Sequence, residues 1–245
     1  MPTIARLCLI STYIEDGIRM YFQWGEQRDY ISYSWHCGSF FGTLFVIINL
    51  FCQLIPCGLI LARKHANIAC YILFGTIALQ TVAYRILWDF RFLLRNLSLA
   101  GGLILLLVEN KPEAKSLFAG LPNIGDDKPK NYMQFIGRIL IVIMFFTLLR
   151  FDWSVFHVMN NVLGTALILS VAIGYKTKPS AAFLIFFLAI SNFLSNPFWT
   201  VASDQPLHDF LKYDFFQTLS VIGGLFFIVA LGPGGVSLDE HKKGL

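Results

Sequence analysis

Two neighbouring carboxylates, Glu15 and Asp16, lie inside an apolar segment near the start of this 245-residue chain. An ionisable group within a membrane-spanning segment costs roughly 2.5 to 3.5 kcal/mol on insertion scales, so each acid is a candidate for a functional role. The alternative is structural, because Arg19 follows Glu15 by four residues on the same helical face and could neutralise it. Asp16 has no arginine at that spacing, which favours a role in binding.

The other chemically active side chains do not form a recognisable catalytic arrangement. No nucleophile and base, metal-ligand spacing or phosphate-binding loop is evident in the sequence. The five cysteines contain no CxxC pair, and a net charge of +4 is too small to suggest nucleic acid as a partner. We therefore predict a protein that is not an enzyme and that has no cofactor and no metal site.

The elements that position these acids are predicted to be membrane helices. Hydrophobic residues make up 56% of the chain and charged residues only 14%. About 18 to 20 apolar residues are needed to cross the hydrocarbon layer. The segments that meet or approach this length are residues 4–22, 38–62, 66–84, 92–108, 133–149, 155–175, 179–203 and 215–238. The predicted fold class is an all-α polytopic membrane protein of about eight transmembrane helices.

The charges of the short turns predict the orientation of these spans. An even number of spans places both termini on one side, and that side carries the basic turns Arg63-Lys64 and Lys176 with Lys178. Basic loops stay in the cytosol, so both termini are predicted to be cytosolic. The final residues include Lys242 and Lys243, which look like a dilysine retrieval signal read by the COPI coat.

The sequence also shows signs of an internal duplication. Leu97 to Leu103 recurs as Leu219 to Leu225, and Asp89-Phe90 recurs as Asp209-Phe210. We predict one transmembrane domain with two parallel four-helix repeats, related by a pseudo-two-fold axis along the membrane normal. The expected divisions are a first repeat at about 1–110, a cytosolic linker at about 111–132, a second repeat at about 133–235 and a cytosolic tail at 236–245.

Several longer motifs carry a resemblance to a known family. They lie at residues 5–12, 15–20, 26–30, 208–218 and 232–237, and they closely resemble the Surfeit locus protein four family of endoplasmic reticulum cargo receptors. The resemblance implies a receptor that binds soluble secretory proteins in the lumen and loads them into COPII vesicles. It also implies retrieval by COPI and cycling through the intermediate compartment and early Golgi. Membrane lipids surround such a protein. The sequence leaves open whether the protein forms a homo-oligomer.

The resemblance further implies cargo whose amino terminus carries apolar residues around a proline. Such a ligand needs an apolar slot and a group that receives its ammonium. The candidate cargo-binding residues are Glu15, Asp16, Trp88, Asp89, Trp199, His208, Asp209 and Asp214. The expected charge partners are Arg19, Arg85, Arg91 and Arg95. The two tryptophans, taken as equivalent in the two halves, would form the walls of the apolar slot. An aromatic belt at the membrane interface also explains their positions.

His208 is a candidate for control of release, because histidine changes its charge over mildly acidic pH and this one stands beside Asp209. The main alternative function is a small-solute or lipid transporter, because parallel repeats of helices also build transporters. No proline-broken span occurs at matching positions in both halves, since Pro56 and Pro197 do not correspond. Solute flux into proteoliposomes would distinguish a transporter from a receptor.

Overall fold

The computed structural model describes residues 2–110, 128–148, 155–203, 205–232 and 237, and these residues form helices and turns without a strand. The eight long helices among them are α1 (Pro2–Phe22), α3 (Gly38–Leu61), α4 (Ala66–Ala83), α5 (Phe90–Asn110), α7 (Lys128–Leu148), α8 (Val155–Ile173), α9 (Thr177–Ser195) and α10 (Pro206–Leu231). In the described part of the chain, α3, α4, α5, α9 and α10 contain stretches long and apolar enough to cross a membrane. The prediction of an all-α polytopic membrane protein is confirmed.

Some predicted boundaries were wrong. The seventh span was placed at residues 179–203, but α9 ends at Ser195, because Pro197 follows and favours the end of a helix. Helix α10 begins at Pro206, nine residues before the predicted start at 215, since its first two turns are polar but still helical. Residues 128–132 belong to α7 rather than to a linker. Lys242, Lys243 and the side chain of Arg91 lie outside the described residues.

A short polar helix, α2 (Trp24–Trp35), was not predicted. It follows α1 almost directly and packs on α3, and its Ile31 is buried. Two single turns of 3-10 helix, η1 (Ile86–Trp88) and η2 (Phe198–Thr200), follow α4 and α9.

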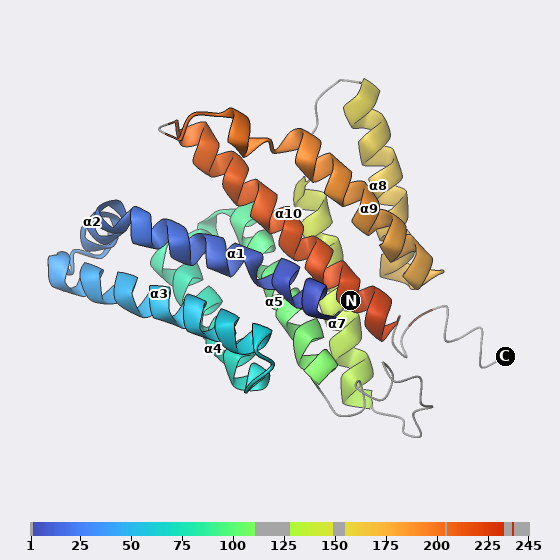
Figure 1. Cartoon of the computed structure of the whole chain (residues 1–245), viewed down its shortest axis with the longest axis horizontal. Coiled ribbons are helices and arrows are strands. Elements are labelled where there is room, and N and C mark those ends of the chain that lie inside the picture. The colour runs from blue at the N-terminus through green and yellow to red at the C-terminus, as the bar shows by residue number, and fades with distance from the viewer. Residues whose placement is uncertain (1, 111–127, 149–154, 204, 233–236, 238–245) are drawn as a thin grey trace.

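Four helices form the centre of the bundle. Helix α10 packs along α1, and α5 packs along α7, while α3 and α4 flank one side and α8 and α9 the other (Figure 1). Glycines allow the central pairs to approach closely, as is usual for membrane helices. A Cβ atom on Gly223 of α10 would lie 2.4 Å from the backbone nitrogen of Leu9 on α1. A Cβ atom on Gly101 of α5 would lie 3.1 Å from the carbonyl oxygen of Gly137 on α7.

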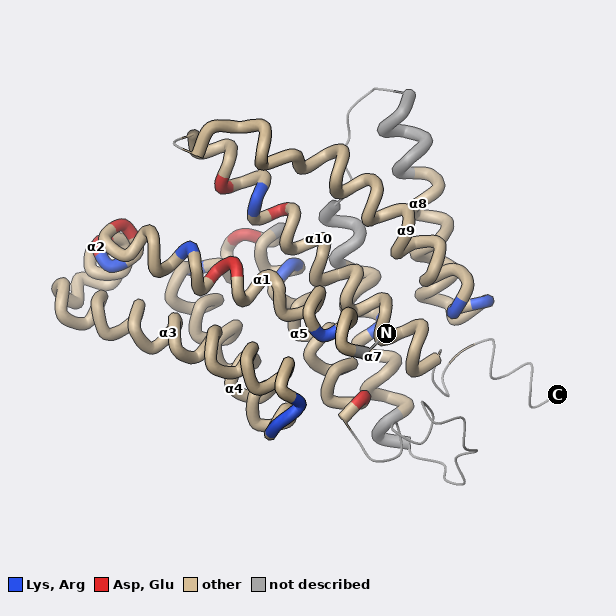
Figure 2. The backbone as a smooth tube through the Cα atoms, in the orientation of Figure 1, with Lys and Arg blue, Asp and Glu red and all other residues tan. Residues whose placement is uncertain are grey.

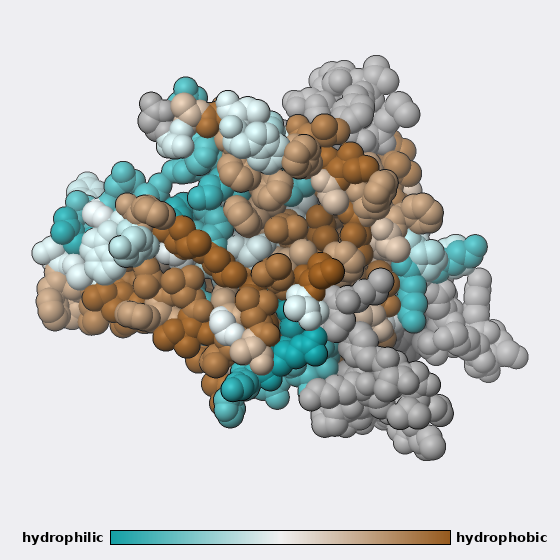
Figure 3. Space-filling model, in the orientation of Figure 1, coloured by the Kyte–Doolittle hydropathy of each residue, from teal (hydrophilic) through white to brown (hydrophobic). Residues whose placement is uncertain are grey.

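Charge is distributed unevenly along the bundle. Acidic positions gather near α2 and the starts of α5 and α10, whereas the turns that join α3 to α4 and α8 to α9 are basic (Figure 2). The surface between these ends is largely hydrophobic, with a hydrophilic area where α1, α2 and α10 meet (Figure 3). The orientation derived from these charges, with the acidic end in the lumen, stays a prediction.

Candidate functional site

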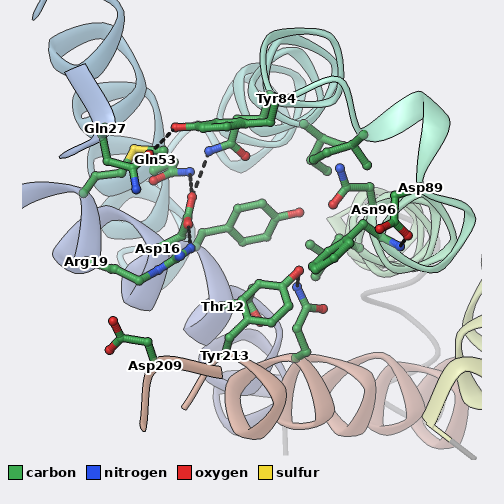
Figure 4. Close-up of a pocket in the computed structure, with 18 of the residues that line it drawn as sticks. Thr12, Asp16, Arg19, Gln27, Gln53, Tyr84, Asp89, Asn96, Asp209 and Tyr213 are labelled. Atoms are coloured by element: carbon green, nitrogen blue, oxygen red, sulfur yellow. Dashed lines mark hydrogen bonds and ion pairs between the residues drawn. The ribbon is translucent and has the colours of Figure 1, made fainter. Parts of the chain in front are cut away.

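A cavity of about 690 Å³ opens at the acidic end of the bundle. Its walls come from the carboxyl-terminal parts of α1 and α4, the starts of α5 and α10, the middle of α3, and α2 (Figure 4). Its volume falls within the range of about 300 to 1,000 Å³ that is typical of ligand pockets. The lining residues that carry charge are Asp16, Arg19, Glu26, Arg85, Asp89 and Asp209.

Asp16 is held in the cavity wall by residues from three helices (Figure 4). One carboxylate oxygen forms an ion pair with Arg19 on the same helix. The other accepts hydrogen bonds from the amides of Gln53 on α3, at 2.5 Å, and Gln80 on α4, at 2.8 Å. The side chain of Asp16 is 16% exposed, so the carboxylate is fixed in position and still reachable from the cavity.

The outer part of the cavity carries a ring of further acids. Asp209 accepts a hydrogen bond from the Gln23 amide at 2.7 Å, which ties the start of α10 to the end of α1. Asp89 accepts a hydrogen bond from the backbone N–H of Phe92 at 3.3 Å and so caps the start of α5. Glu26 of α2 lies on the exposed rim.

Helix α2 forms one side of this rim. The Tyr84 hydroxyl donates a hydrogen bond to Gln27 at 2.8 Å, and the Tyr84 ring stacks on Tyr30 with centroids 5.6 Å apart. The indole of Trp35 donates to the carbonyl of Ala83 at 2.9 Å. These contacts fix α2 against the end of α4, so the rim on this side is built from an ordered helix.

A buried ion pair supports the wall formed by α5 and α10. Arg95 lies 2.7 Å from Asp214, and both side chains are at most 10% exposed. The guanidinium of Arg95 also lies over the ring of Tyr213, 5.4 Å from its centroid. Arg19 lies over the same ring, at 5.8 Å. Tyr213 is therefore placed between two arginines, and Asp214 acts behind the cavity wall rather than on its surface.

Glu15 is also behind the wall. Its side chain is 1% exposed and lies 3.6 Å from Arg19 and 3.9 Å from Lys212. Neither carboxylate oxygen has a hydrogen bond among the described residues. Glu15 therefore balances the charge of Arg19, as the structural alternative expected. Arg19 contacts Asp16 as well, because residues three apart on a helix are also neighbours, a spacing that the sequence argument did not consider.

The two tryptophans and His208 lie away from the described lining of the cavity. Trp88 is 90% exposed, and Trp199 packs on Phe193 with ring centroids 4.7 Å apart. When the two 3-10 turns are aligned, Trp88 corresponds to Thr200, so the tryptophans are not at equivalent positions. His208 reaches the cavity indirectly, since its Nδ1 lies 3.3 Å from Asp209.

Sequence reasoning missed the uncharged polar residues of the cavity. Tyr13, Gln53, Gln80, Asn96 and Gln217 all line it, and each lies within a predicted span. The signal was present, because an amide inside a membrane helix is unfavourable unless it finds a partner. These residues were missed because they carry no charge.

The fold is that of a polytopic membrane protein, and the polar cavity between its helices is a candidate binding site. The chain belongs to the SURF4 family, whose model matches residues 1–245. It is 58% identical over 243 residues to the Surfeit locus protein 4 homolog of Drosophila melanogaster, which covers 99% of this chain and 90% of the relative.

Two fungal relatives are more distant. The Surfeit locus protein 4 homolog of Schizosaccharomyces pombe is 36% identical over 257 residues, covering 99% of this chain and 82% of the relative. The ER-derived vesicles protein ERV29 of Saccharomyces cerevisiae is 36% identical over 245 residues, covering 99% and 77%. No solved structure matches the chain. The prediction of the family is confirmed.

Proposed function

We propose that this protein is a cargo receptor of the early secretory pathway, which binds the amino-terminal segments of soluble secretory proteins in its luminal cavity. Support for a role in traffic from the endoplasmic reticulum comes from the family, one of whose members is named an ER-derived vesicles protein. Support for the binding mode comes from the cavity. Loading into COPII vesicles and return by COPI belong to the proposal.

The shape of the cavity favours a chain end as its ligand. The cavity opens at the acidic end of the bundle, and the helices pack tightly beyond its inner end. There Leu9, Leu103 and Ile141 are at most 1% exposed, and Gly223 brings α10 against α1. A cavity that is closed at its inner end can admit the end of a polypeptide, whereas an internal segment would have to enter and leave by the same opening.

The charges of the cavity favour an amino terminus over a carboxyl terminus. The lining carries four carboxylates, from Asp16, Glu26, Asp89 and Asp209, against the guanidinium groups of Arg19 and Arg85. Complementary charge attracts a cationic group and disfavours an anionic one. Aromatic and aliphatic side chains between these groups, such as Met20, Phe92 and Tyr213, offer an apolar surface to the following residues.

The depth of the cavity sets the length of the segment. Asp209 lies at the rim, and Gln217 lies on the same helix at the inner end, which is about 12 Å at 1.5 Å per residue. An extended chain covers about 3.3 to 3.6 Å per residue, so about three or four residues would enter. The deepest carboxylate of the described lining is that of Asp16, and we assign it as the acceptor of the cargo ammonium.

The experiment that tests this function combines crosslinking with one substitution. A photoreactive peptide that copies the amino terminus of a secreted protein should label α1, α5 and α10 of the full-length receptor in microsomes. In Asp16→Asn, labelling and cargo export should fall at least about tenfold, because a charge-assisted hydrogen bond contributes about 1.5 to 3 kcal/mol. The control Glu26→Gln removes a carboxylate from the exposed rim and should have a smaller effect.

Two outcomes would contradict the receptor function. Labelling confined to the lipid-facing surface would exclude the cavity as the binding site. Uptake of a solute by proteoliposomes would favour the transporter, which needs access to the cavity from both sides. The closely packed inner end, where Leu9, Leu103 and Ile141 are buried, favours the receptor over the transporter.

Retrieval is tested separately. Replacing Lys242 and Lys243 with serine should shift the protein from the endoplasmic reticulum toward the Golgi, as seen by immunofluorescence. An unchanged distribution would show that these lysines are not the retrieval signal. The binding function of the cavity would then still stand, because it depends on the opposite end of the molecule.

A further inference from the structure

Two buried polar atoms at the inner end of the cavity have no hydrogen-bonding partner among the residues that the structure describes. They are the hydroxyl of Tyr13 on α1 and the carbonyl oxygen of Gln217 on α10, and the two residues are 3% and 1% exposed. Both residues line the cavity. The amide nitrogen of Gln217 donates to the Tyr213 hydroxyl at 3.0 Å, which orients the remaining carbonyl.

An unpaired buried hydroxyl or carbonyl is unfavourable, so such groups usually have a partner that binds there. Nearer the opening, the Gln53 carbonyl oxygen is also unpaired among the described residues, but its amide donates to Asp16, and several other polar groups of the wall are paired. The Tyr84 hydroxyl donates to Gln27, and the Gln80 amide donates to Asp16. The unpaired atoms therefore mark the inner end as the part of the cavity that a ligand completes.

Their depth matches the path of a chain terminus. Tyr13 lies three residues before Asp16 on α1, about one helical turn further into the membrane. Gln217 lies one turn beyond Tyr213 on α10. An ammonium held between Asp16 and the Gln217 carbonyl therefore lies at the inner end of the cavity, and the first residue can lie across the cavity with its carbonyl oxygen at the Tyr13 hydroxyl.

We propose that Tyr13 and Gln217 form a subsite for the first residue of the cargo, so that the receptor takes peptides with a free, unmodified amino terminus. Gln217 accepts a hydrogen bond from the ammonium, and Tyr13 donates its hydroxyl proton to the carbonyl oxygen of the first residue. Acetylation removes the positive charge and adds atoms where the cavity ends. This inference rests on the proposed binding of amino termini and assigns the residues that recognise the terminal unit.

The test uses the full-length protein in lipid nanodiscs and a hexapeptide with a free amino terminus, apolar residues at its first three positions and a fluorophore at its carboxyl end. Fluorescence anisotropy gives the dissociation constant. Tyr13→Phe and Gln217→Met should each weaken binding about three- to tenfold, the effect of one lost hydrogen bond. The acetylated hexapeptide should bind the parent at least about 30-fold more weakly, since it loses a charged contact.

Tyr71→Phe is the control, because it removes the same atom from a tyrosine that is 65% exposed and does not line the cavity. Its affinity should change less than about twofold. A second peptide, in which sulfur replaces the first carbonyl oxygen, provides a weaker acceptor for Tyr13. Tyr13→Phe should weaken binding of this peptide much less than binding of the oxygen peptide.

Particular results would overturn the subsite. If Tyr13→Phe and Gln217→Met bind the hexapeptide as tightly as the parent, their polar atoms serve bound water rather than cargo. Equal affinity of the acetylated and free peptides would also contradict it. If Asp16→Asn loses binding while these two variants keep it, the subsite is wrong and the proposed function stands. If the free peptide does not bind the parent, the proposed function itself fails.

Discussion

The acidic ends of the two halves of this molecule differ, although in each half the third long helix, α4 or α9, is followed by a short 3-10 turn. In the first half, α4 and η1 border a polar cavity. In the second half, the space next to α9 and η2 is filled by aromatic rings that contact one another, from Phe193, Phe198, Trp199, Phe215 and Phe216. We call the acidic end of the first half the hollow end and that of the second half the packed end.

The helices behind these ends pair in a corresponding way. A Cβ atom on Gly102 of α5 would lie 2.3 Å from a methyl carbon of Leu9 on α1. A Cβ atom on Gly224 of α10 would lie 2.3 Å from a methyl carbon of Ile141 on α7. Apart from the contacts of α2, each pair of neighbouring helices in the first half has a contacting counterpart in the described second half. The duplication itself stays a prediction, which these correspondences support.

The difference arises from a few positions. Asp16 of α1 corresponds in the predicted alignment to Leu148 of α7, and Gln80 of α4 corresponds to Asn192 of α9. Gln80 reaches across the cavity wall to a carboxylate, whereas the amide of Asn192 donates to the backbone carbonyl of Phe215 at 3.0 Å. The second half uses its amide to join two helices. The comparison shows that the two halves place amides at similar positions, but only in the first half does the amide line a cavity.

The largest effect is expected where the two halves agree. Gly223→Leu should prevent α10 from packing on α1 and lose the folded protein, because even a Cβ atom meets the backbone of Leu9 at 2.4 Å. The expected destabilisation exceeds about 4 kcal/mol. Monodisperse yield on size-exclusion chromatography checks it. Gly75→Leu is the control, since no atom lies within 4 Å of its Cβ position. Gly101 of α5 corresponds to Gly223 in the predicted duplication, so Gly101→Leu should also prevent folding. A harmless Gly101→Leu would contradict the equivalence of the two halves.

A smaller but still large effect is expected at the ion pair that joins the halves. Asp214→Asn leaves Arg95 buried without its counter-charge and should destabilise the protein by about 3 to 5 kcal/mol. Thermal unfolding of the purified protein measures this. Asp16→Asn should cost much less stability, because Arg19 keeps Glu15 as a partner. Equal losses of stability in the two variants would mean that Asp16 is also mainly structural.

The packed end should tolerate change without loss of binding. Phe198→Ala removes a partly buried ring that contacts Trp199, Phe215 and Phe216 and should destabilise the protein by about 1 to 3 kcal/mol. The Phe198 ring also lies 5.9 Å from the ring of His208, but His208 does not line the cavity, so peptide affinity at the hollow end should stay within about twofold. Phe186→Ala, on a side chain 68% exposed, is the matched control for stability. A large loss of peptide affinity in Phe198→Ala would show that the packed end also belongs to the site.

Much of the fold could be predicted from the sequence, because the membrane requires long apolar segments and their charge-free runs are easy to find. Helix α2 was missed, since its twelve residues are mostly polar or aromatic and have neither the length nor the hydropathy of a span. The start of α10 was missed for a related reason: hydropathy does not detect a helix that continues beyond the apolar layer.

The candidate site could be predicted only in part. Asp16, Asp89 and Asp209 were identified because charges in apolar segments are conspicuous, and all three line the cavity. Asp214 looked similar, but it pairs with Arg95 across two helices, which no local spacing could reveal. The amide of Gln53 and the hydroxyl of Tyr13 needed the tertiary arrangement, because only packing shows whether a polar side chain faces a partner, lipid or a cavity.

The smallest predicted effect concerns release of the bound peptide at acidic pH. It would show whether His208 belongs to the binding site at the hollow end. His208 does not line the cavity but lies 3.3 Å from Asp209, which does. A positive charge on this imidazole would attract the Asp209 carboxylate and compete with a cationic ligand, which is how His208 would take part in release. If it does, the ratio of the peptide affinities at pH 7.2 and pH 6.0 should be about threefold smaller in His208→Ala than in the parent. The same affinity ratio in parent and variant would show that His208 has no part in release, and would leave the carboxylates of the cavity as the groups to test next.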